Sequence, residues 1–317
     1  MEVSVIICTY NRAGFLKSCI DSILSNTYPD FGLTIVDQSE NNETKNLVNE
    51  YARYDNRIKY LCSKKGRTRA LNLGIRRTIG EVIAKTDDDC VVSQDWIEKI
   101  VSFFALHPDA AIVLGDVIPG EYDASTEVIP MCRSRNRKYF GTLSMRKGIG
   151  MGANMSIKRW VFEKVGWFDE VLGSPVHLKS SDDWDFFYRT LAKGYSIYDT
   201  NLIKVQHNGR RNFEEAKKLW RGYQITTTAF LVKNLRCGDF TALLVLIGTT
   251  WMKFYELVWS AKFVSKSESL LSSLKSKLGK FLFCLLGIYG AFSWTFIGIL
   301  KSLEYSVDKD KRLFIEK

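Results

Sequence analysis

The alternation of short apolar runs with amphipathic stretches over the first ninety residues constrains the fold of this chain more than any other feature. Between the runs, apolar residues recur at the three- and four-residue spacing of amphipathic helices. The runs have the length and β-branched composition of buried strands, and they span 3–9, 31–36, 58–61 and 81–84. Strands that alternate with helices through short links predict an α/β fold with a doubly wound, mostly parallel sheet.

Carboxylates follow two of these predicted strands. Asp37 ends the second strand, and Asp87, Asp88 and Asp89 follow the fourth. Open α/β sheets place their ligand crevice at the carboxyl ends of their strands. Adjacent carboxylates repel one another, and Mg²⁺ or Mn²⁺ both compensates them and holds substrate phosphates. An acidic surface turn is the alternative for the triplet, and a turn or cap role is the alternative for Asp37.

Composition narrows the class of ligand and the compartment. The 317 residues carry a formal net charge of +10, which favours phosphorylated ligands or anionic lipid. No zinc-finger spacing and no aromatic RNA-binding motif occurs, so we expect no nucleic-acid partner. Seven scattered cysteines without a C-x-x-C pair argue against a disulfide framework. The N-terminus lacks the features of a signal peptide, so the catalytic part is expected on the cytoplasmic side.

The first predicted strand is not followed by a glycine-rich dinucleotide fingerprint or by a P-loop. Dehydrogenase and P-loop nucleotidase functions therefore lose support. Five segments in order instead resemble the family-2 glycosyltransferases of the GT-A fold. They are Val3-Ser-Val-Ile-Ile-Cys-Thr-Tyr-Asn-Arg12, Ile35-Val-Asp-Gln-Ser39, Arg69-Ala-Leu-Asn-Leu-Gly-Ile75, Thr86-Asp-Asp-Asp-Cys90 and Ser181-Asp-Asp-Trp-Asp-Phe-Phe-Tyr-Arg189. The resemblance covers roughly residues 1–215 and implies a catalytic domain over 1–212.

This resemblance implies a nucleotide-sugar donor, with a UDP-sugar favoured. The residues it assigns to donor binding are Thr9, Tyr10, Asn11, Arg12, Asp37, Arg69, Asp87, Asp88, Gly152 and Asn154. Asp37 would accept a hydrogen bond from the base, and Arg69 would lie near the base or the diphosphate, with a helix-surface arginine as the alternative. Gly152 and Asn154 belong to a glycine-rich stretch, 148–154, that we interpret as the lining of the sugar pocket.

The resemblance also implies a divalent cation, Mn²⁺ or Mg²⁺. Asp87 and Asp89 are the outer members of a D-x-D motif, with Asp89 favoured as the direct ligand and the division with Asp88 left open. His207 would be a third protein contact to the metal or the diphosphate. A structural histidine is the alternative reading of that position.

Asp182 and Asp183 match the pair of acids that the family carries before a helix, with aspartate in place of glutamate at the first position. Inverting transfer needs a carboxylate that removes the proton of the acceptor hydroxyl. We expect Asp183 to be this general base and Asp182 to position acceptor or base, although the departure leaves their division open. Acids in a first helical turn also favour the helix dipole, which is the structural alternative.

The last hundred residues, 213–317, predict an all-α, membrane-associated region. Apolar and basic residues from 213 to 227 suggest an interfacial helix, with packing against the catalytic domain as the alternative. The charge-free segment 281–300 has the length of a transmembrane helix, whereas 240–252 is too short to span alone. Five lysines within 262–280 favour the cytoplasmic face of the membrane.

These predictions combine into an inverting, metal-dependent glycosyltransferase that extends a lipid-linked or polysaccharide acceptor in cell-surface glycan synthesis. A sugar nucleotidyltransferase and a catalytically inactive membrane scaffold are the rival classes. The first would need a glycine- and lysine-rich phosphate loop after the first strand, and the second would have lost its acidic motifs. The sequence has no such loop and keeps both acidic motifs.

Overall fold

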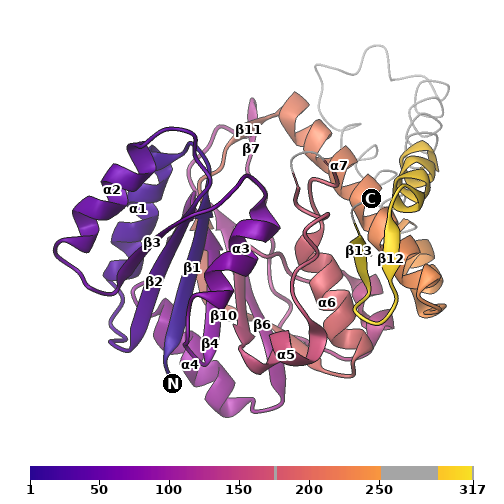
Figure 1. The fold of residues 1–317 in the computed structure, drawn as a ribbon, viewed down its shortest axis with the longest axis horizontal. Helices are drawn as coiled ribbons and strands as arrows, with labels where there is room; N and C mark the ends of the chain where they lie inside the picture. Colours follow the sequence, from indigo (N-terminus) through magenta and orange to yellow (C-terminus); the bar gives the residue numbers. More distant parts are fainter. Residues whose placement is uncertain (175–176, 251–291, 316–317) are drawn as a thin grey trace.

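The computed structural model describes residues 1–174, 177–250 and 292–315 (Figure 1). Within these residues, nine strands form one mixed sheet in the order β3-β2-β1-β4-β9-β6-β10-β5, with β8 paired to β10. Four parallel strands make its first half, β1 (Val3–Thr9), β2 (Phe31–Asp37), β3 (Ile58–Cys62) and β4 (Val82–Asp87). The predicted α/β class and the mostly parallel sheet are confirmed.

Helices connect these parallel strands as the apolar spacing predicts. They are α1 (Ala13–Leu24), α2 (Glu43–Ala52) and α3 (Arg67–Arg76). The buried residues of α1 and α2 join the core on one face of the sheet, and those of α3 join the core on the other face. Covering both faces explains why the strands are almost continuously apolar.

The second half of the sheet is mixed. β9 (Asn154–Lys158) runs antiparallel between β4 and β6 (Ala110–Pro119). β10 (Ser196–His207) is parallel to β6, and β5 (Cys90–Val92) is antiparallel to β10. The β5–β10 register places Cys90 opposite His207, so the end of β10, 117 residues further along the chain, lies beside the acidic turn.

The remaining helices of the catalytic region are α4 (Trp96–Leu106), α5 (Trp160–Val165) and α6 (Asp182–Ala192). Asp95 is the N-cap residue of α4. The Ser93 hydroxyl donates to Oδ1 of Asp95 at 2.7 Å. Between β6 and β9 lie two short strands, β7 (Glu127–Val128) and β8 (Lys138–Tyr139), and a 3₁₀ helix, η1 (Thr142–Lys147).

The helix α7 (Phe213–Arg236) begins after the two-residue strand β11 (Arg211–Asn212). A capping box fixes its start, since Asn212 Oδ1 accepts from Glu215 N at 2.9 Å and Glu215 Oε2 accepts from Asn212 N at 3.0 Å. The middle of α7, including Phe230, belongs to the same core as α6 (Figure 1). The helix therefore packs against the catalytic region, which was the alternative to an interfacial helix.

The all-α prediction for the C-terminal region is wrong. Residues 241–250 and 292–303 are helical, but β12 (Ser306–Asp308) and β13 (Leu313–Ile315) then form an antiparallel hairpin. The backbone N–H of Phe314 donates to the buried Asp169 at 2.8 Å, so the hairpin docks on the catalytic region. None of the described helices has the length and hydropathy to cross a bilayer. The lysine-rich segment 262–280 and most of 281–300 lie outside the described residues.

Candidate active site

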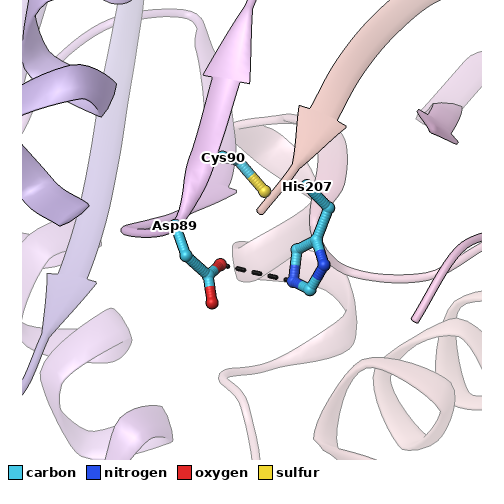
Figure 2. A group of neighbouring side chains, drawn as sticks. All are labelled: Asp89, Cys90 and His207. Carbon is cyan, nitrogen blue, oxygen red and sulfur yellow. Dashed lines mark ion pairs between the residues drawn. The ribbon is translucent and has the colours of Figure 1, made fainter. Parts of the chain in front are cut away.

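The acidic turn and His207 meet at one edge of the sheet. Asp88 and Asp89 form the turn between β4 and β5. His207 is the last residue of β10, the strand that pairs with β5. Nε2 of His207 lies 3.3 Å from Oδ1 of Asp89, and both side chains are buried (Figure 2). The strand pairing thus brings together two groups that the sequence separates by more than a hundred residues.

The chemistry of this cluster fits a divalent cation. Among the described residues, Oδ1 of Asp89 and Nδ1 of His207 are buried without a hydrogen-bond partner, which is uncommon for polar atoms of a native fold. Donor atoms of Asp89, Cys90 and His207 lie within 4.8 Å of one another. Burial raises the pKa of the Cys90 thiol, which favours the protonated form over the ligating thiolate. The carboxylate and the imidazole are therefore the better ligands.

Gly209 keeps the space beside these ligands open. A Cβ at this position would lie 2.4 Å from Oδ2 of Asp89 and 2.9 Å from Cε1 of His207. Only a residue without a side chain leaves the Asp89 carboxylate where it is. The backbone N–H of Asn208 also donates to the carbonyl of Asp89 at 2.8 Å, which ties the His207–Gly209 segment to the acidic turn.

Asp88 has hydrogen-bond partners other than His207. Its Oδ2 accepts from the Thr9 hydroxyl at 2.7 Å, and its Oδ1 accepts from Arg12 at 3.2 Å. Burial raises the pKa of Asp88 to about 6. Arg12 also lies 2.9 Å from Oδ2 of Asp89, so one guanidinium compensates two neighbouring carboxylates. These contacts make Asp88 a support of the turn and leave Asp89 as the member that faces His207.

Asp87 is held by Lys85, its neighbour on the same face of β4. Nζ of Lys85 lies 2.5 Å from Oδ1 of Asp87 and 2.9 Å from the carbonyl of Gly152. Burial opposes ionisation of Asp87, but the charge and hydrogen bond of Lys85 outweigh it and lower the pKa to about 2. Asp87 is therefore a fixed negative charge.

Two cavities meet at Asp87. One of about 350 Å³ lies over the acidic turn, where Thr9, Tyr10 and Arg12 line it. The other is about 540 Å³ and has mainly apolar walls from the 128–131 and 149–155 segments and from α7. Both cavities are lined by Arg67, Asp87 and Arg211. A ligand with a phosphorylated part and a second part could thus extend through both.

The pair Asp182–Asp183 opens α6 at the wall of the larger cavity. Asp183 accepts at Oδ2 from the backbone N–H of Gly152 at 2.8 Å and at Oδ1 from that of Trp184 at 2.8 Å. Burial, and then the charge of Asp182, raise the pKa of Asp183. Asp182 itself is ion-paired with Arg67. Arg67 thereby compensates the charge of Asp182, whereas Asp183 lines the cavity with a raised pKa.

Most predicted donor residues lie at these cavities. Thr9, Tyr10, Arg12, Asp87 and Asp88 line the smaller cavity, and Gly152 lines the larger one. Gly152 comes so close to Asp183 that a Cβ there would lie 3.1 Å from Oδ2. The glycine therefore permits the hydrogen bond between its own N–H and the carboxylate.

Asn11 and Asp37 lie behind the smaller cavity. Asn11 adopts a φ of 53°, and its N–H donates to the Ser39 hydroxyl at 2.8 Å. Asp37 is buried, with Oδ1 accepting from Ser39 N at 2.8 Å and Oδ2 accepting from the Tyr60 hydroxyl at 2.9 Å. Neither side chain is among those that line the two cavities of the described chain.

Two other predicted residues lie away from the two cavities described above. Arg69 pairs with Glu170 at 3.2 Å and lines neither of the two described cavities. Asn154 is buried inside the sheet, where Nδ2 donates to the carbonyls of Asp116 and Ile203 at 2.9 and 3.1 Å. Its Oδ1 accepts from the Trp96 indole at 3.0 Å. Asn154 thus joins strands and a helix, and it is not among the residues that line either cavity described above.

Sequence reasoning missed three basic residues of the site: Arg67, Lys85 and Arg211. Arg67 stands two positions before the predicted Arg69 in the same helix, and it is Arg67 that lines both cavities. Lys85 shares a face of β4 with Asp87, because side chains alternate along a strand, and that spacing could have revealed it. Arg211 reaches the site through the short β11–β7 pairing, for which the sequence has no clear signal.

Comparison with known proteins gives a consistent result. The model of the family "Glycosyl transferase family 2" matches residues 4–166. A glucosyl-dolichyl phosphate glucuronosyltransferase of Haloferax volcanii is 30% identical over 188 residues, which are 55% of this chain and 58% of that protein. Glycosyltransferase AglE of the same organism is 27% identical over 69% of this chain and 71% of its own length.

Solved structures share the fold. A mannosyltransferase from Pyrobaculum calidifontis, in complex with GDP-Man and Mn²⁺, superposes with a TM-score of 0.61 at 17% identity, covering 95% of this chain and 86% of that one. S. aureus TarS 1–349 in complex with UDP-GlcNAc gives a TM-score of 0.55 at 14% identity, covering 93% and 82%. The family model, the named relatives and the shared GT-A architecture show that this chain is a glycosyltransferase and belongs to glycosyl transferase family 2.

Proposed function

We propose that the protein transfers a sugar, with inversion, from a nucleotide-sugar donor to a lipid-linked acceptor, and that it requires a divalent cation. The observation that carries this proposal is the buried Asp89–His207 contact at the wall of the smaller cavity, which shares Arg67, Asp87 and Arg211 with the larger cavity that the base candidate lines. A nucleoside diphosphate fits the smaller, polar cavity, and the sugar and acceptor fit the larger one. Among donors we favour a UDP-sugar.

Asp89 and His207 would hold the cation, Mn²⁺ or Mg²⁺, which when bound supplies positive charge to the donor diphosphate. Arg67 and Arg211 line both cavities and can contact phosphate oxygens from the protein side. Arg12 and Lys85 keep Asp88, Asp89 and Asp87 in place while the donor is absent. The chain's own residues thus bind and orient the diphosphate as a leaving group.

Asp183 would remove the proton of the acceptor hydroxyl as this oxygen attacks the anomeric carbon. The Gly152 N–H fixes one carboxylate oxygen at 2.8 Å, and the Trp184 N–H fixes the other at the same distance. Burial raises the pKa of Asp183, and a raised pKa makes a carboxylate a stronger base once it is ionised. Asp182, ion-paired with Arg67, would support the position of its neighbour.

The walls of the larger cavity favour an acceptor with an apolar part. Val128, Ile129 and Met131 line it on one side, and Leu219 and Trp220 line it from α7. Saccharide hydroxyls that are buried against these apolar walls, away from the charged side chains where the donor sugar would lie, would lose hydrogen bonds to water without gaining partners. A hydrocarbon chain loses nothing there, so the cavity fits a lipid-linked acceptor better than a free glycan.

Apolar side chains outside the cavity support an association with the cytoplasmic face of a membrane. Phe240, Leu243, Leu244 and Ile247 are exposed at helical spacing, so they share one face of the 240–250 segment. Exposed apolar patches of this kind mark interaction surfaces. Flotation with anionic lipid vesicles would test the association, and a protein that stays at the bottom of the gradient at low salt would contradict it.

The enzymatic proposal is tested by incubating purified protein with a panel of nucleotide sugars and polyprenyl-linked acceptors, with and without chelator. We expect release of nucleoside diphosphate that stops when the metal is removed. Asp183→Asn should keep donor binding and lose transfer, whereas Asp89→Asn should lose metal-dependent donor binding. Release of inorganic pyrophosphate would instead indicate a nucleotidyltransferase. Absence of turnover with every pair would indicate a scaffold.

A further inference from the structure

The backbone immediately before the base candidate is strained. Ser181 has φ 62° and ψ 19°, the left-handed region that residues other than glycine seldom adopt. It is buried and directly precedes Asp182 and Asp183. Such a conformation costs on the order of 1–3 kcal/mol and persists only where surrounding contacts enforce it. The contacts that enforce it therefore also determine where α6 starts.

A cluster of hydroxyls on α7 supplies these contacts. The Ser181 hydroxyl lies 2.7 Å from that of Thr226 and 3.1 Å from that of Thr227. The Ser180 hydroxyl lies 2.9 Å from that of Thr226. All four side chains are buried, so the hydrogen bonds do not compete with water. Hydrogen bonds thus link the residues just before α6 to α7.

A second point of attachment lies two turns further along α7. Nζ of Lys233 is 2.7 Å from Asp185 and 2.8 Å from Asp169, and Arg189 is 2.9 Å from Asp185. These four charges sum to zero and are fully buried. Thr226 and Lys233 are seven residues apart, so they lie on one face of α7. They contact Ser181 and Asp185, which are one turn apart at the start of α6.

We infer that Thr226 and Thr227 are positioning residues for the transfer reaction, because they hold the first turn of α6 so that Asp183 meets the Gly152 N–H. This inference rests on the proposed role of Asp183 as the base. Both helices lie outside residues 4–166, the part that the family model matches. In this arrangement α7, from the C-terminal region, holds the start of α6, and the threonine hydroxyls act through the position of Asp183.

The test replaces the two hydroxyls and keeps the side-chain shape, in the double variant Thr226→Val, Thr227→Val. Misplacing a catalytic group by 1 Å costs on the order of 100-fold in rate. We expect kcat to fall roughly 10- to 100-fold, while the affinity for UDP with Mn²⁺ stays within about twofold, since neither threonine lines the smaller cavity. The double variant Thr226→Ser, Thr227→Ser restores the hydroxyls and should restore kcat.

Thr228→Val is the matched control. Thr228 is the next residue of α7 and is equally buried, but its hydroxyl has no hydrogen-bond partner within the described chain. We expect this variant to keep kcat. Loss of kcat in both valine proteins, or failure of the serine variant to restore it, would reduce the threonines to a general structural role and overturn the inference.

A crystal structure of the double valine variant gives a readout that does not depend on activity. We expect the Ser181 backbone to relax and the 2.8 Å contact between Asp183 and Gly152 N to open, while the Thr228→Val structure keeps both. An unchanged Asp183 position would overturn the inference whatever the kinetics. If Asp183 moves while Asp183→Asn retains full turnover in the parent protein, the positioning is correct and the proposed base is wrong.

Discussion

Gly209→Ala offers a direct test of the cation site, because the glycine touches the site and forms none of its ligands. A Cβ there would lie 2.4 Å from Oδ2 of Asp89. Non-bonded heavy atoms attract at about 3.5 Å or more, so the carboxylate must retreat by roughly 1 Å. Ligand distances at a metal site tolerate only about 0.2 Å. The new methyl group therefore displaces Asp89 well beyond what coordination allows.

The size of the effect follows from this displacement. Disturbing the support of a metal ligand typically lowers metal affinity or activity by about 10- to 100-fold, which corresponds to about 1.4–2.8 kcal/mol. The assay is calorimetric titration of UDP into the protein in Mn²⁺ and, separately, in chelator. We expect Gly209→Ala to weaken UDP binding about 10- to 100-fold in Mn²⁺ and to leave the metal-free affinity unchanged.

Gly14→Ala is the matched control. A Cβ at Gly14, in the first turn of α1, would meet no heavy atom within 4 Å. The substitution should leave UDP binding unchanged and raise the free energy of unfolding by up to about 1 kcal/mol. If Gly209→Ala keeps the full Mn²⁺-dependent gain in affinity, the carboxylate of Asp89 does not coordinate the cation in the way the site indicates, and the reasoning fails.

Three further predictions concern residues whose placement only the structure shows. Lys233→Met removes the cation that the buried Asp169 and Asp185 share, and Arg189 then pairs with Asp185 alone, so the free energy of unfolding should fall by about 3–5 kcal/mol in urea titration; a loss below about 1 kcal/mol would contradict the buried network. Asn154→Ala should lower stability by about 1–3 kcal/mol and keep UDP affinity in the folded protein, whereas a selective loss of affinity would restore its predicted sugar contact. Arg67→Ala should abolish transfer and Arg69→Ala should keep it, as measured by release of nucleoside diphosphate; equal losses would contradict the placement of the two arginines.

The sequence predicts the fold correctly where secondary structure follows from the spacing of neighbouring apolar residues. The four parallel strands and three helices of the first ninety residues follow from apolar periodicity, which depends only on neighbouring residues. The C-terminal hairpin could not be predicted from the sequence, because β12 and β13 have three residues each and are stabilised by docking to Asp169. Strands this short carry no periodicity of their own.

The candidate site divides in the same way. The acidic turn at the end of β4 follows from strand topology, since a parallel sheet presents the carboxyl ends of its strands at one edge. Arg67 and Arg69 look equivalent in the sequence, because both lie in the first turn of α3. Their directions around the helix differ by about 200°. Only the packing of α3 decides that Arg67 faces Asp182 and that Arg69 faces Glu170.

The sequence by itself determined the family, the α/β sheet and the position of the acids at its edge, because these depend on periodicity and on motifs of a few consecutive residues. Tertiary structure alone decided that His207 lies opposite Cys90 and that the hydroxyls of α7 hold a left-handed Ser181. Such contacts join residues 45 to more than a hundred positions apart. They result from strand register and helix packing, and no local pattern specifies either.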